Sequence, residues 1–372
     1  MRAAVMYAAN APLTIEDVQV LPPGRGEVLV RLAASGVCHS DYHALIGEWT
    51  VPTPMVLGHE GAGVVEEVGP EVVEVAVGDH VILSWAPNCR RCFYCAQGRP
   101  ALCELMARTA ANSLMPDGTT RLRLGDQTVY QFGGVASFGE YAVVPESGAI
   151  PIRKDMPLDG AALLGCGVAT GVGAVINTAR VEAGSSVLVI GCGGVGLSAI
   201  QGAVLSSAYP LIAVDLLDSK LDQALALGAT HTLNPSRDDV AAEIRELTNG
   251  RGVDYAFEAI GLTRTIEQAY ESIRPGGTAV VVGQVPEGHR ISIDPFVMSD
   301  REKTLKGSNY GSCRPSIDFP KFVDLYLAGK LKLDELISRS IRLDEVNEAF
   351  DAMIRGEVVR SVIRYDSDTF GR

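Results

Sequence analysis

The sequence has little basic charge and no uninterrupted hydrophobic run. Its 372 residues include 32 Lys and Arg against 45 Asp and Glu, which gives a formal net charge of −13. No basic stripe is present that would neutralise phosphates, and this argues against nucleic acid or an anionic membrane surface as a partner. No internal repeat, low-complexity segment or signal peptide is visible either, so we expect a cytoplasmic protein.

Two uncharged stretches are long enough to span a bilayer, between Asp159 and Arg180 and between Glu182 and Asp215. Glycines interrupt both stretches, and Pro210 breaks the second. In a large α/β protein, a buried strand, a turn and a buried helix give the same pattern. We therefore expect both stretches to lie inside a folded domain and not in a membrane.

Four cysteines lie close together with the spacing C-x2-C-x2-C-x7-C: Cys89, Cys92, Cys95 and Cys103. Pro87, Gly98 and Pro100 break the surrounding segment, residues 87–105, so that all four thiolates can turn toward one cation. Structural zinc prefers four sulfur ligands in a closed tetrahedron. The alternative is a pair of disulfides, which needs an oxidising compartment that nothing at the N-terminus indicates. The spacing therefore predicts a structural zinc.

The pattern of predicted elements changes about halfway along the chain. The first half contains short β-branched runs: Val28–Ala34, Ala62–Val68, His80–Ser84 and Tyr141–Val144. After about Ala169 we expect strands at Val187–Ile190, Leu211–Val214, near His231, Tyr255–Phe257, Thr278–Val282 and near Thr304, alternating with helices at Val195–Ser206, Ser219–Leu227, Val240–Leu247 and Thr263–Ile273. Such alternation predicts a parallel, doubly wound sheet. The tail predicts helices at Phe319–Ala328 and Asp344–Gly356, capped by Asp344 and Gly356, and a strand at Val358–Tyr365.

Three glycines connect a predicted strand to a predicted helix in a G-x-G-x-x-G pattern: Gly191, Gly193 and Gly196. The first glycine allows a tight turn, the second lets the backbone approach a pyrophosphate, and the third lets helix and strand pack closely. Asp215 follows Gly196 by 19 residues, at the end of the next strand. A carboxylate there accepts hydrogen bonds from the ribose of NAD and repels the 2′-phosphate of NADP, and Lys220 offers a second ribose contact. We therefore predict NAD as the cofactor.

A second group of metal-binding residue types is spread over three distant segments. Cys38, His59 and Cys166 would give two sulfurs and one nitrogen, leaving one zinc position open for chemistry. Because the three are far apart in sequence, buried packing is the alternative interpretation of each.

The motifs GVCHSDYH, GHEGAGVVEEVG, LLGCGVATG, VIGCGGVG and VVRSVIRY, with the four-cysteine lobe, resemble the zinc-dependent alcohol dehydrogenases of the medium-chain dehydrogenase/reductase superfamily. The 62 residues between Cys103 and Cys166 match its long-loop branch, which includes animal-type, glutathione-dependent formaldehyde and bacterial nicotinoprotein enzymes. The resemblance implies an α/β fold with two domains. A GroES-like, mostly-β catalytic domain would comprise residues 1–167 and 311–372, and a Rossmann NAD-binding domain residues 168–310, with the active cleft between them.

The resemblance also implies roles for individual residues. It places the catalytic zinc on Cys38, His59 and Cys166, with Glu60 as a transient ligand and Asp41 orienting His59. It places His39 and Arg360 at the cofactor diphosphate, and Thr170 and Val195 at the nicotinamide.

The resemblance implies hydride transfer between an alcohol and NAD, and the proton must then leave a closed pocket. The order C-H-S-D-x-H suggests a relay from the alcohol through Ser40 and the nicotinamide ribose hydroxyl to His43. Alignment to the family places Trp49, Trp85 and Phe132 around the substrate. Aromatic lining favours apolar, including aromatic, primary alcohols.

Three alternatives stay open. One is a thiol-adduct formaldehyde dehydrogenase, although its acidic residue and arginine align with Trp49 and Ala107, with Arg108 one position away. Another is a nicotinoprotein that holds NAD(H) permanently. The third, of a different class, is a non-catalytic NAD-binding zinc protein. The resemblance implies that the segment Gly277–Ile293 carries the edge of the sixth strand of the nucleotide domain. We expect a homodimer formed through this edge, with a tetramer as the alternative.

Overall fold

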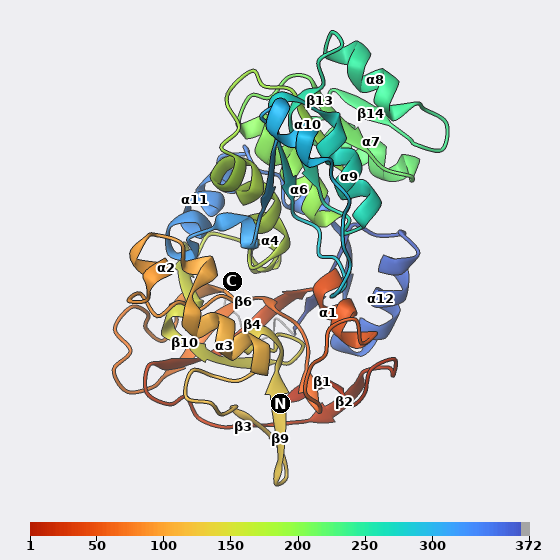
Figure 1. Cartoon of the computed structure of the whole chain (residues 1–372). Helices are drawn as coiled ribbons and strands as arrows, with labels where there is room; N and C mark the ends of the chain where they lie inside the picture. The colour runs from red at the N-terminus through yellow and green to blue at the C-terminus, as the bar shows by residue number, and fades with distance from the viewer. Residues whose placement is uncertain (366–372) are drawn as a thin grey trace. The chain divides into compact units, whose positions relative to one another are not determined.

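The computed structural model describes residues 1–365, except for the side chains of residues 110 and 111. It divides into two compact units, Met1–Cys166 with Arg314–Arg372, and Gly167–Cys313 (Figure 1). The nucleotide-binding domain was expected to comprise residues 168–310. The second unit of the structure begins one residue earlier, at Gly167, and ends three residues later, at Cys313.

The first unit is built on two sheets. The six-stranded sheet has the order β2 (Thr14–Asp17), β1 (Arg2–Met6), β5 (Met55–Val56), β9 (Gln127–Gln131), β8 (Leu122–Leu124) and β3 (Gln19–Val20). The seven-stranded sheet has the order β11 (Ala149–Ile152), β7 (His80–Leu83), β6 (Glu60–Val68), β4 (Glu27–Gly36), β19 (Arg360–Arg364) and β18 (Ile337–Ile341), and β10 (Tyr141–Pro145) also pairs with β4. The helices of this unit are α1 (His39–Leu45), α2 (Phe93–Ala96), α3 (Glu104–Asn112), α4 (Leu158–Leu164), α11 (Pro315–Leu327) and α12 (Val346–Ile354).

The second unit is a single parallel sheet with helices in its connections. Its strand order is β14 (His231–Leu233), β13 (Leu211–Val214), β12 (Val187–Ile190), β15 (Val253–Glu258), β16 (Ile273–Val281) and β17 (Thr304–Gly307). The helices are α5 (Gly167–Gly173), the π-helical segment Ala174–Ala179, α6 (Gly194–Leu205), α7 (Asp218–Ala226), α8 (Val240–Leu247), α9 (Thr263–Ser272) and α10 (Pro295–Asp300). In chain order the strands read 3-2-1-4-5-6, which is the doubly wound Rossmann arrangement.

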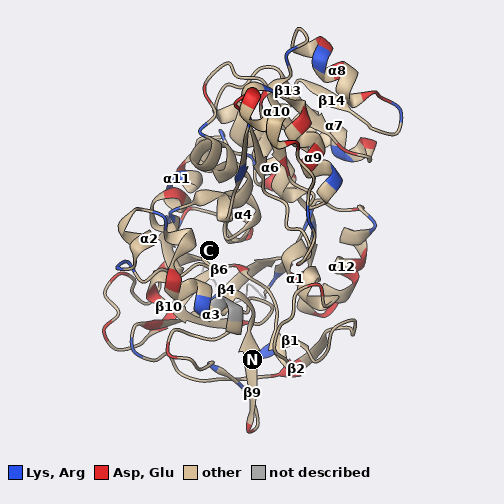
Figure 2. Cartoon of the chain, in the orientation of Figure 1, with Lys and Arg blue, Asp and Glu red and all other residues tan. Residues whose placement is uncertain are grey.

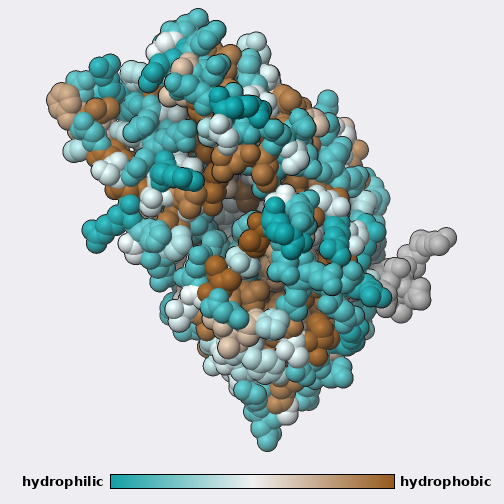
Figure 3. Space-filling model, turned by 90° about the vertical axis from the view of Figure 1, so that its right-hand side faces the viewer, coloured by the Kyte–Doolittle hydropathy of each residue, from teal (hydrophilic) through white to brown (hydrophobic). Residues whose placement is uncertain are grey.

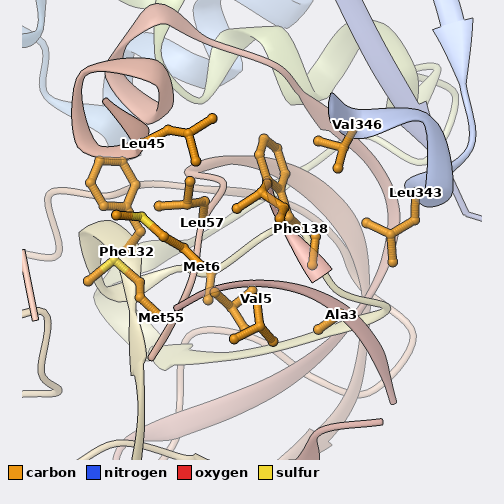
Figure 4. Close-up of a cluster of buried hydrophobic side chains, with 14 of the residues drawn as sticks. Ala3, Val5, Met6, Leu45, Met55, Leu57, Phe132, Phe138, Leu343 and Val346 are labelled. Atoms are coloured by element: carbon orange, nitrogen blue, oxygen red, sulfur yellow. The ribbon is translucent and has the colours of Figure 1, made fainter. Parts of the chain in front are cut away.

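A buried hydrophobic cluster in the first unit supports the elements that carry the candidate metal ligands. It includes Ala44 and Leu45 of α1, Leu57 just before β6, and Phe132 and Phe138 (Figure 4). Burying side chains of this size contributes roughly 1.5–3 kcal/mol each relative to exposure. The cluster therefore fixes α1 against the segment that ends at His59.

Charged residues of both signs occur on each unit. Figure 2 shows acidic and basic residues interspersed over both units. Figure 3 shows one face that is largely hydrophilic, with scattered hydrophobic patches. Among residues 1–365, no single helix has the length and apolar composition needed to cross a bilayer, although α4 and Gly167–Ala179 taken together pass that test.

Three expectations about secondary structure were wrong. The stretch between Asp159 and Arg180 forms helices and contains no strand. The tail helix α12 begins at Val346, and its N-cap is Glu345 and not the expected Asp344. Asp344 lies within a preceding 3₁₀ turn, Leu343–Glu345. The C-cap of α12 is Arg355, and Gly356 follows with φ +71°.

The expected sheet edge was also misplaced. The segment Gly277–Ile293 starts in β16, which is flanked by β15 and β17, so β17 forms the edge instead. Strand β17, which follows α10, pairs in parallel with β16 and so covers the edge that was expected to be exposed.

Candidate metal and cofactor sites

Four side chains from three distant segments converge in the first unit. Cys38 is the N-cap of α1, His59 directly precedes β6, Glu60 begins β6, and Cys166 follows α4. One ligand atom from each lies within 4.8 Å of those of the others. All four residues are buried. The structure thus brings together the three zinc ligands expected from the sequence, with Glu60 beside them.

Asp41 ties the ligand-bearing segments to one another. Its side chain is fully buried, and Oδ1 accepts hydrogen bonds from the backbone N–H of Gly58 at 2.9 Å and from Nδ1 of His59 at 3.1 Å. Oδ2 accepts from the backbone N–H of Cys38 at 3.3 Å. Because a carboxylate only accepts, Nδ1 of His59 carries the proton and Nε2 presents its lone pair.

The donor set fits a divalent cation. Nε2 of His59 is buried and has no hydrogen-bond partner within the described part of the chain. A hydrogen bond from the Cys166 thiol holds the pKa of Cys38 well below its usual value, and the same bond, with burial, raises the pKa of Cys166. A cation bound between the two thiols would favour the ionised form of both.

The Glu60 carboxylate is paired with Arg360, a residue that the resemblance places at the cofactor diphosphate. The Arg360 guanidinium at the start of β19 is 6% exposed and donates a hydrogen bond to Oε2 of Glu60. Although burial alone would lower the pKa of Arg360, the charge of Glu60 raises it. In this arrangement Arg360 neutralises the carboxylate beside the cluster, so a contact with the cofactor diphosphate stays a prediction. His39, expected at the same diphosphate, is the first residue of α1.

The four cysteines of the lobe also converge, with ligand atoms within 4.8 Å of one another: Cys89, Cys92, Cys95 and Cys103. None of the eight cysteines forms a disulfide. Backbone N–H groups of Cys95 and Glu104 lower the pKa of Cys92 to about 6, whereas burial raises the pKa of Cys95 to about 12. Four thiols this close together, none of them in a disulfide, form a suitable site for structural zinc.

The glycine-rich turn has the geometry expected for a dinucleotide. Gly191 has φ +95°, and a Cβ on Gly196 would lie 1.7 Å from the Gly191 carbonyl oxygen. A Cβ on Gly193 would meet nothing within 4 Å. Gly193 is also the N-cap of α6, so the open side of the turn faces the positive end of a helix.

Four further predicted cofactor residues also lie in the second unit: Asp215, Lys220, Thr170 and Val195. Asp215 follows β13, and its carboxylate accepts hydrogen bonds from the backbone N–H groups of Cys192 at 2.8 Å and Leu217 at 3.0 Å. Asp215 therefore fixes the glycine-rich turn in addition to its expected ribose contact. Lys220 lies in the first turn of α7, the helix that follows Asp215 in the chain. Thr170 on α5 and Val195 on α6 belong to helices that pack directly on each other.

The predicted relay and pocket residues lie around α1 and His59. Ser40 lies beside Cys38, with the thiol 3.8 Å from its Oγ. His43, in the last turn of α1, stacks on Trp49 with ring centroids 5.0 Å apart. The Phe132 ring meets His59 edge-on at 5.5 Å, but the residue is only 8% exposed and belongs to the buried cluster. Trp85 packs against a separate hydrophobic cluster.

Glu48 was not predicted from the sequence, and its carboxylate accepts a hydrogen bond from Nδ1 of His43. Glu48 belongs to none of the motifs quoted above. Its only signal was a carboxylate five residues after a histidine, separated from it by Gly47.

Comparison with known proteins supports this architecture. Residues 24–154 match the alcohol dehydrogenase GroES-like domain, and residues 194–328 match the zinc-binding dehydrogenase domain. The chain is 41% identical to S-(hydroxymethyl)glutathione dehydrogenase of Paracoccus denitrificans, covering 98% of this chain and 99% of the relative. It is 40% identical to an NDMA-dependent alcohol dehydrogenase of Amycolatopsis methanolica, covering 99% of each.

Solved structures show the same likeness over the whole chain. The crystal structure of benzyl alcohol dehydrogenase from Acinetobacter calcoaceticus has a TM-score of 0.93 and 35% identity, covering 98% of this chain and 99% of that one. With the two metal-ligand clusters and the glycine-rich turn, these matches establish the family. The chain belongs to the zinc-binding alcohol dehydrogenases of the medium-chain dehydrogenase/reductase superfamily and is an oxidoreductase.

Proposed function

We propose that this chain interconverts a primary alcohol and its aldehyde, using NAD and a zinc held by Cys38, His59 and Cys166. The observation that carries the proposal is the convergence of these three ligands within 4.8 Å, with Nε2 of His59 buried and without a hydrogen-bond partner. Zinc in this position would act as a Lewis acid on the substrate oxygen, and NAD would accept the hydride. A second zinc in the cysteine lobe would be structural.

The surrounding side chains would orient the ligands and move the proton. Asp41 holds His59 in the tautomer that presents Nε2 to the cation. Ser40, next to Cys38, would take the proton of the alcohol, and His43 in the following turn of α1 would deliver it to solvent. The partial exposure of His43, 18% of its side chain, suits the outer station of such a path.

For the substrate, we propose S-(hydroxymethyl)glutathione as the first candidate. Relatives that are 41% identical over nearly the whole chain carry the names S-(hydroxymethyl)glutathione dehydrogenase and class-3 alcohol dehydrogenase. These names favour the thiol-adduct alternative over the apolar and aromatic alcohols expected from the sequence, an expectation that is not confirmed.

Aromatic primary alcohols are the second candidate, because aromatic rings flank two histidines of the site. Trp49 stacks on His43, and Phe132 contacts His59. The resemblance aligns Trp49 with the acidic residue of the thiol-adduct enzymes. Arg108 lies on the exposed side of α3. The solved benzyl alcohol dehydrogenase is consistent with this candidate.

A substrate panel on the zinc-loaded protein tests the function and separates the candidates. NADH formation is measured with S-(hydroxymethyl)glutathione, benzyl alcohol and hexanol, before and after chelation of zinc. The highest kcat/KM with the glutathione adduct supports the first candidate, and the highest with benzyl alcohol supports the second. Failure of all three alcohols contradicts the proposed reaction.

Two further properties belong to the proposal. NAD(H) either exchanges or stays bound, as in a nicotinoprotein, and denaturing the purified protein and testing for released NADH distinguishes these cases. A homodimer is proposed over a tetramer, and sedimentation equilibrium measures the oligomeric state.

A non-catalytic NAD-binding protein is the alternative of a different class. Such a protein would bind zinc and the cofactor but would show no turnover in the substrate panel.

A further inference from the structure

His43 and Glu48 form a paired unit at the end of α1. Nδ1 of His43 hydrogen-bonds Oε2 of Glu48. A carboxylate accepts and cannot donate, so the Nδ1 atom must carry the proton of this bond. The side chains are 18% and 35% exposed, which leaves the pair partly accessible to water.

The loop after α1 holds Glu48 in this position. Ile46 caps the helix, and Gly47 turns the chain with φ +77°, a left-handed conformation that favours glycine. The backbone N–H of Trp49 then donates to the carbonyl of His43 at 3.2 Å. This bond folds residues 46–49 back over the last helical turn.

The face of the imidazole ring is also restrained, by Trp49. The Trp49 indole stacks on the His43 ring, with centroids 5.0 Å apart and ring planes at 24°. The stacked ring restrains the imidazole plane, and the hydrogen bond to Glu48 selects which edge of that plane faces the loop. In the neutral ring with its proton on Nδ1, Nε2 lies on the other edge and keeps its lone pair.

We propose that Glu48 is a positioning residue for proton transfer, fixing the tautomer and orientation of His43 so that Nε2 accepts the proton released in alcohol oxidation. This inference rests on the proposed function. The proton leaves the substrate hydroxyl, passes through Ser40 and arrives at Nε2, which becomes part of an imidazolium that Glu48 stabilises. Release of the same proton to solvent restores the neutral ring, with no change in its oxidation state.

The test compares variants of the zinc-loaded, full-length protein. Glu48→Leu removes the acceptor, and Glu48→Gln keeps its size and one acceptor oxygen. Glu66→Leu is the matched control, because Glu66 pairs with Arg31 at 2.9 Å and is 44% exposed, away from His43. The measurements are kcat, KM, the solvent deuterium isotope effect, and the ¹⁵N NMR spectrum of the histidine rings. The His43→Gln spectrum assigns His43 among the six histidines.

We expect Glu48→Leu to lower kcat by about tenfold, the scale found for partners that orient a functional histidine. KM should stay unchanged, the solvent isotope effect should rise, and imidazole in the buffer should restore part of kcat. Glu48→Gln should retain more activity than Glu48→Leu, and Glu66→Leu should match the wild type. The NMR spectrum should show Nδ1 of His43 protonated in the wild type and a tautomer mixture in Glu48→Leu.

A Glu48→Leu variant with wild-type kcat and isotope effect overturns the inference, and so does a wild-type His43 without a proton on Nδ1. A parallel loss of melting temperature and kcat without rescue by imidazole shows a merely structural role and overturns it too. A wild-type protein that oxidises no alcohol in the panel contradicts the proposed function and this inference with it. A defect confined to the Glu48 variants leaves the proposed function intact.

Discussion

Asp41 and His59 form a buried hydrogen bond, with Oδ1 3.1 Å from Nδ1. The same carboxylate accepts backbone hydrogen bonds beside both Cys38 and His59. A single side chain on α1 therefore fixes the distance between two ligands that are 21 residues apart in the sequence.

Replacing the Asp41 carboxylate should lower the affinity for zinc more than it lowers the stability of the fold. We expect Asp41→Asn to lower zinc affinity at the catalytic site about 10–100-fold, because an amide cannot serve both Nδ1–H and the two backbone donors equally well. Competition with a chromogenic chelator measures the affinity. Asp126→Asn, an exposed position in the turn between β8 and β9, is the control. An unchanged affinity for Asp41→Asn would show that the bond does not support the ligand.

Two glycines of the cofactor turn should respond differently to the same substitution. A Cβ on Gly193 meets no atom within 4 Å, so Gly193→Ala should fold normally and weaken NAD binding by about tenfold, or ~1.4 kcal/mol. A Cβ on Gly196 would lie 1.7 Å from a carbonyl oxygen, so Gly196→Ala should lower the melting temperature. Calorimetric titration with NAD and thermal unfolding distinguish the two. Equal effects of both variants on NAD affinity and stability would contradict this assignment.

The buried pair of Glu60 and Arg360 should show strong coupling. Removing one partner leaves a buried charge, so Arg360→Met should destabilise the protein by about 3–5 kcal/mol. The double variant Glu60→Leu with Arg360→Met should cost less than the sum of the single variants. Denaturant unfolding of the wild type, the two single variants and the double variant measures the coupling. Strictly additive changes in the free energy of unfolding would show that the two charges do not stabilise each other.

Asp254 should make the stability of the second unit depend on pH. Oδ2 accepts from the backbone N–H and the hydroxyl of Ser186, at 2.7 and 2.6 Å, and Oδ1 accepts from Nε of Arg274 at 2.6 Å. Burial raises the pKa of Asp254, but these bonds outweigh it and hold the pKa below its usual value. A lowered pKa in the folded state means that the stabilisation is complete above the unfolded pKa, about 3.9, and is lost as the pH falls through the folded value.

Asp254→Asn should therefore be less stable than the wild type at pH 7 by about 1–3 kcal/mol, the scale of charged hydrogen bonds. The difference should shrink below about pH 4, where the wild-type carboxyl also becomes protonated. Denaturant unfolding at both pH values measures it. A difference that is constant with pH would mean that the charge of Asp254 is not the stabilising feature.

The Rossmann strands were predictable because they are buried on both faces and bounded by turn-forming residues, such as Gly191 after the first strand and Pro210 before the second. The runs Val187–Ile190 and Leu211–Val214 form strands with the predicted bounds, and Val240–Leu247 forms the predicted helix. The helices between Asp159 and Arg180 were not predicted. Gly171 lies in α5, where a Cβ would come within 2.3 Å of the Val195 carbonyl oxygen. Close packing on α6 therefore requires a residue of poor helix propensity, which obscures the helical pattern.

The candidate site was predictable only where residues belong to a motif. The resemblance grouped Cys38, His59 and Cys166, which composition and spacing alone left apart. The bond between Glu48 and His43 depends on the turn at Gly47, and the pairing of Glu60 with Arg360 joins residues 300 positions apart. Neither follows from local sequence, because both depend on how the chain folds back on itself.

Diffraction at the zinc absorption edge from crystals of the zinc-loaded protein tests the central proposal most directly. We predict an anomalous peak among Cys38, His59 and Cys166, with zinc–sulfur distances of about 2.3 Å and a zinc–nitrogen distance of about 2.0–2.1 Å to Nε2 of His59. The absence of a peak there, or a peak held by other residues, would contradict the account.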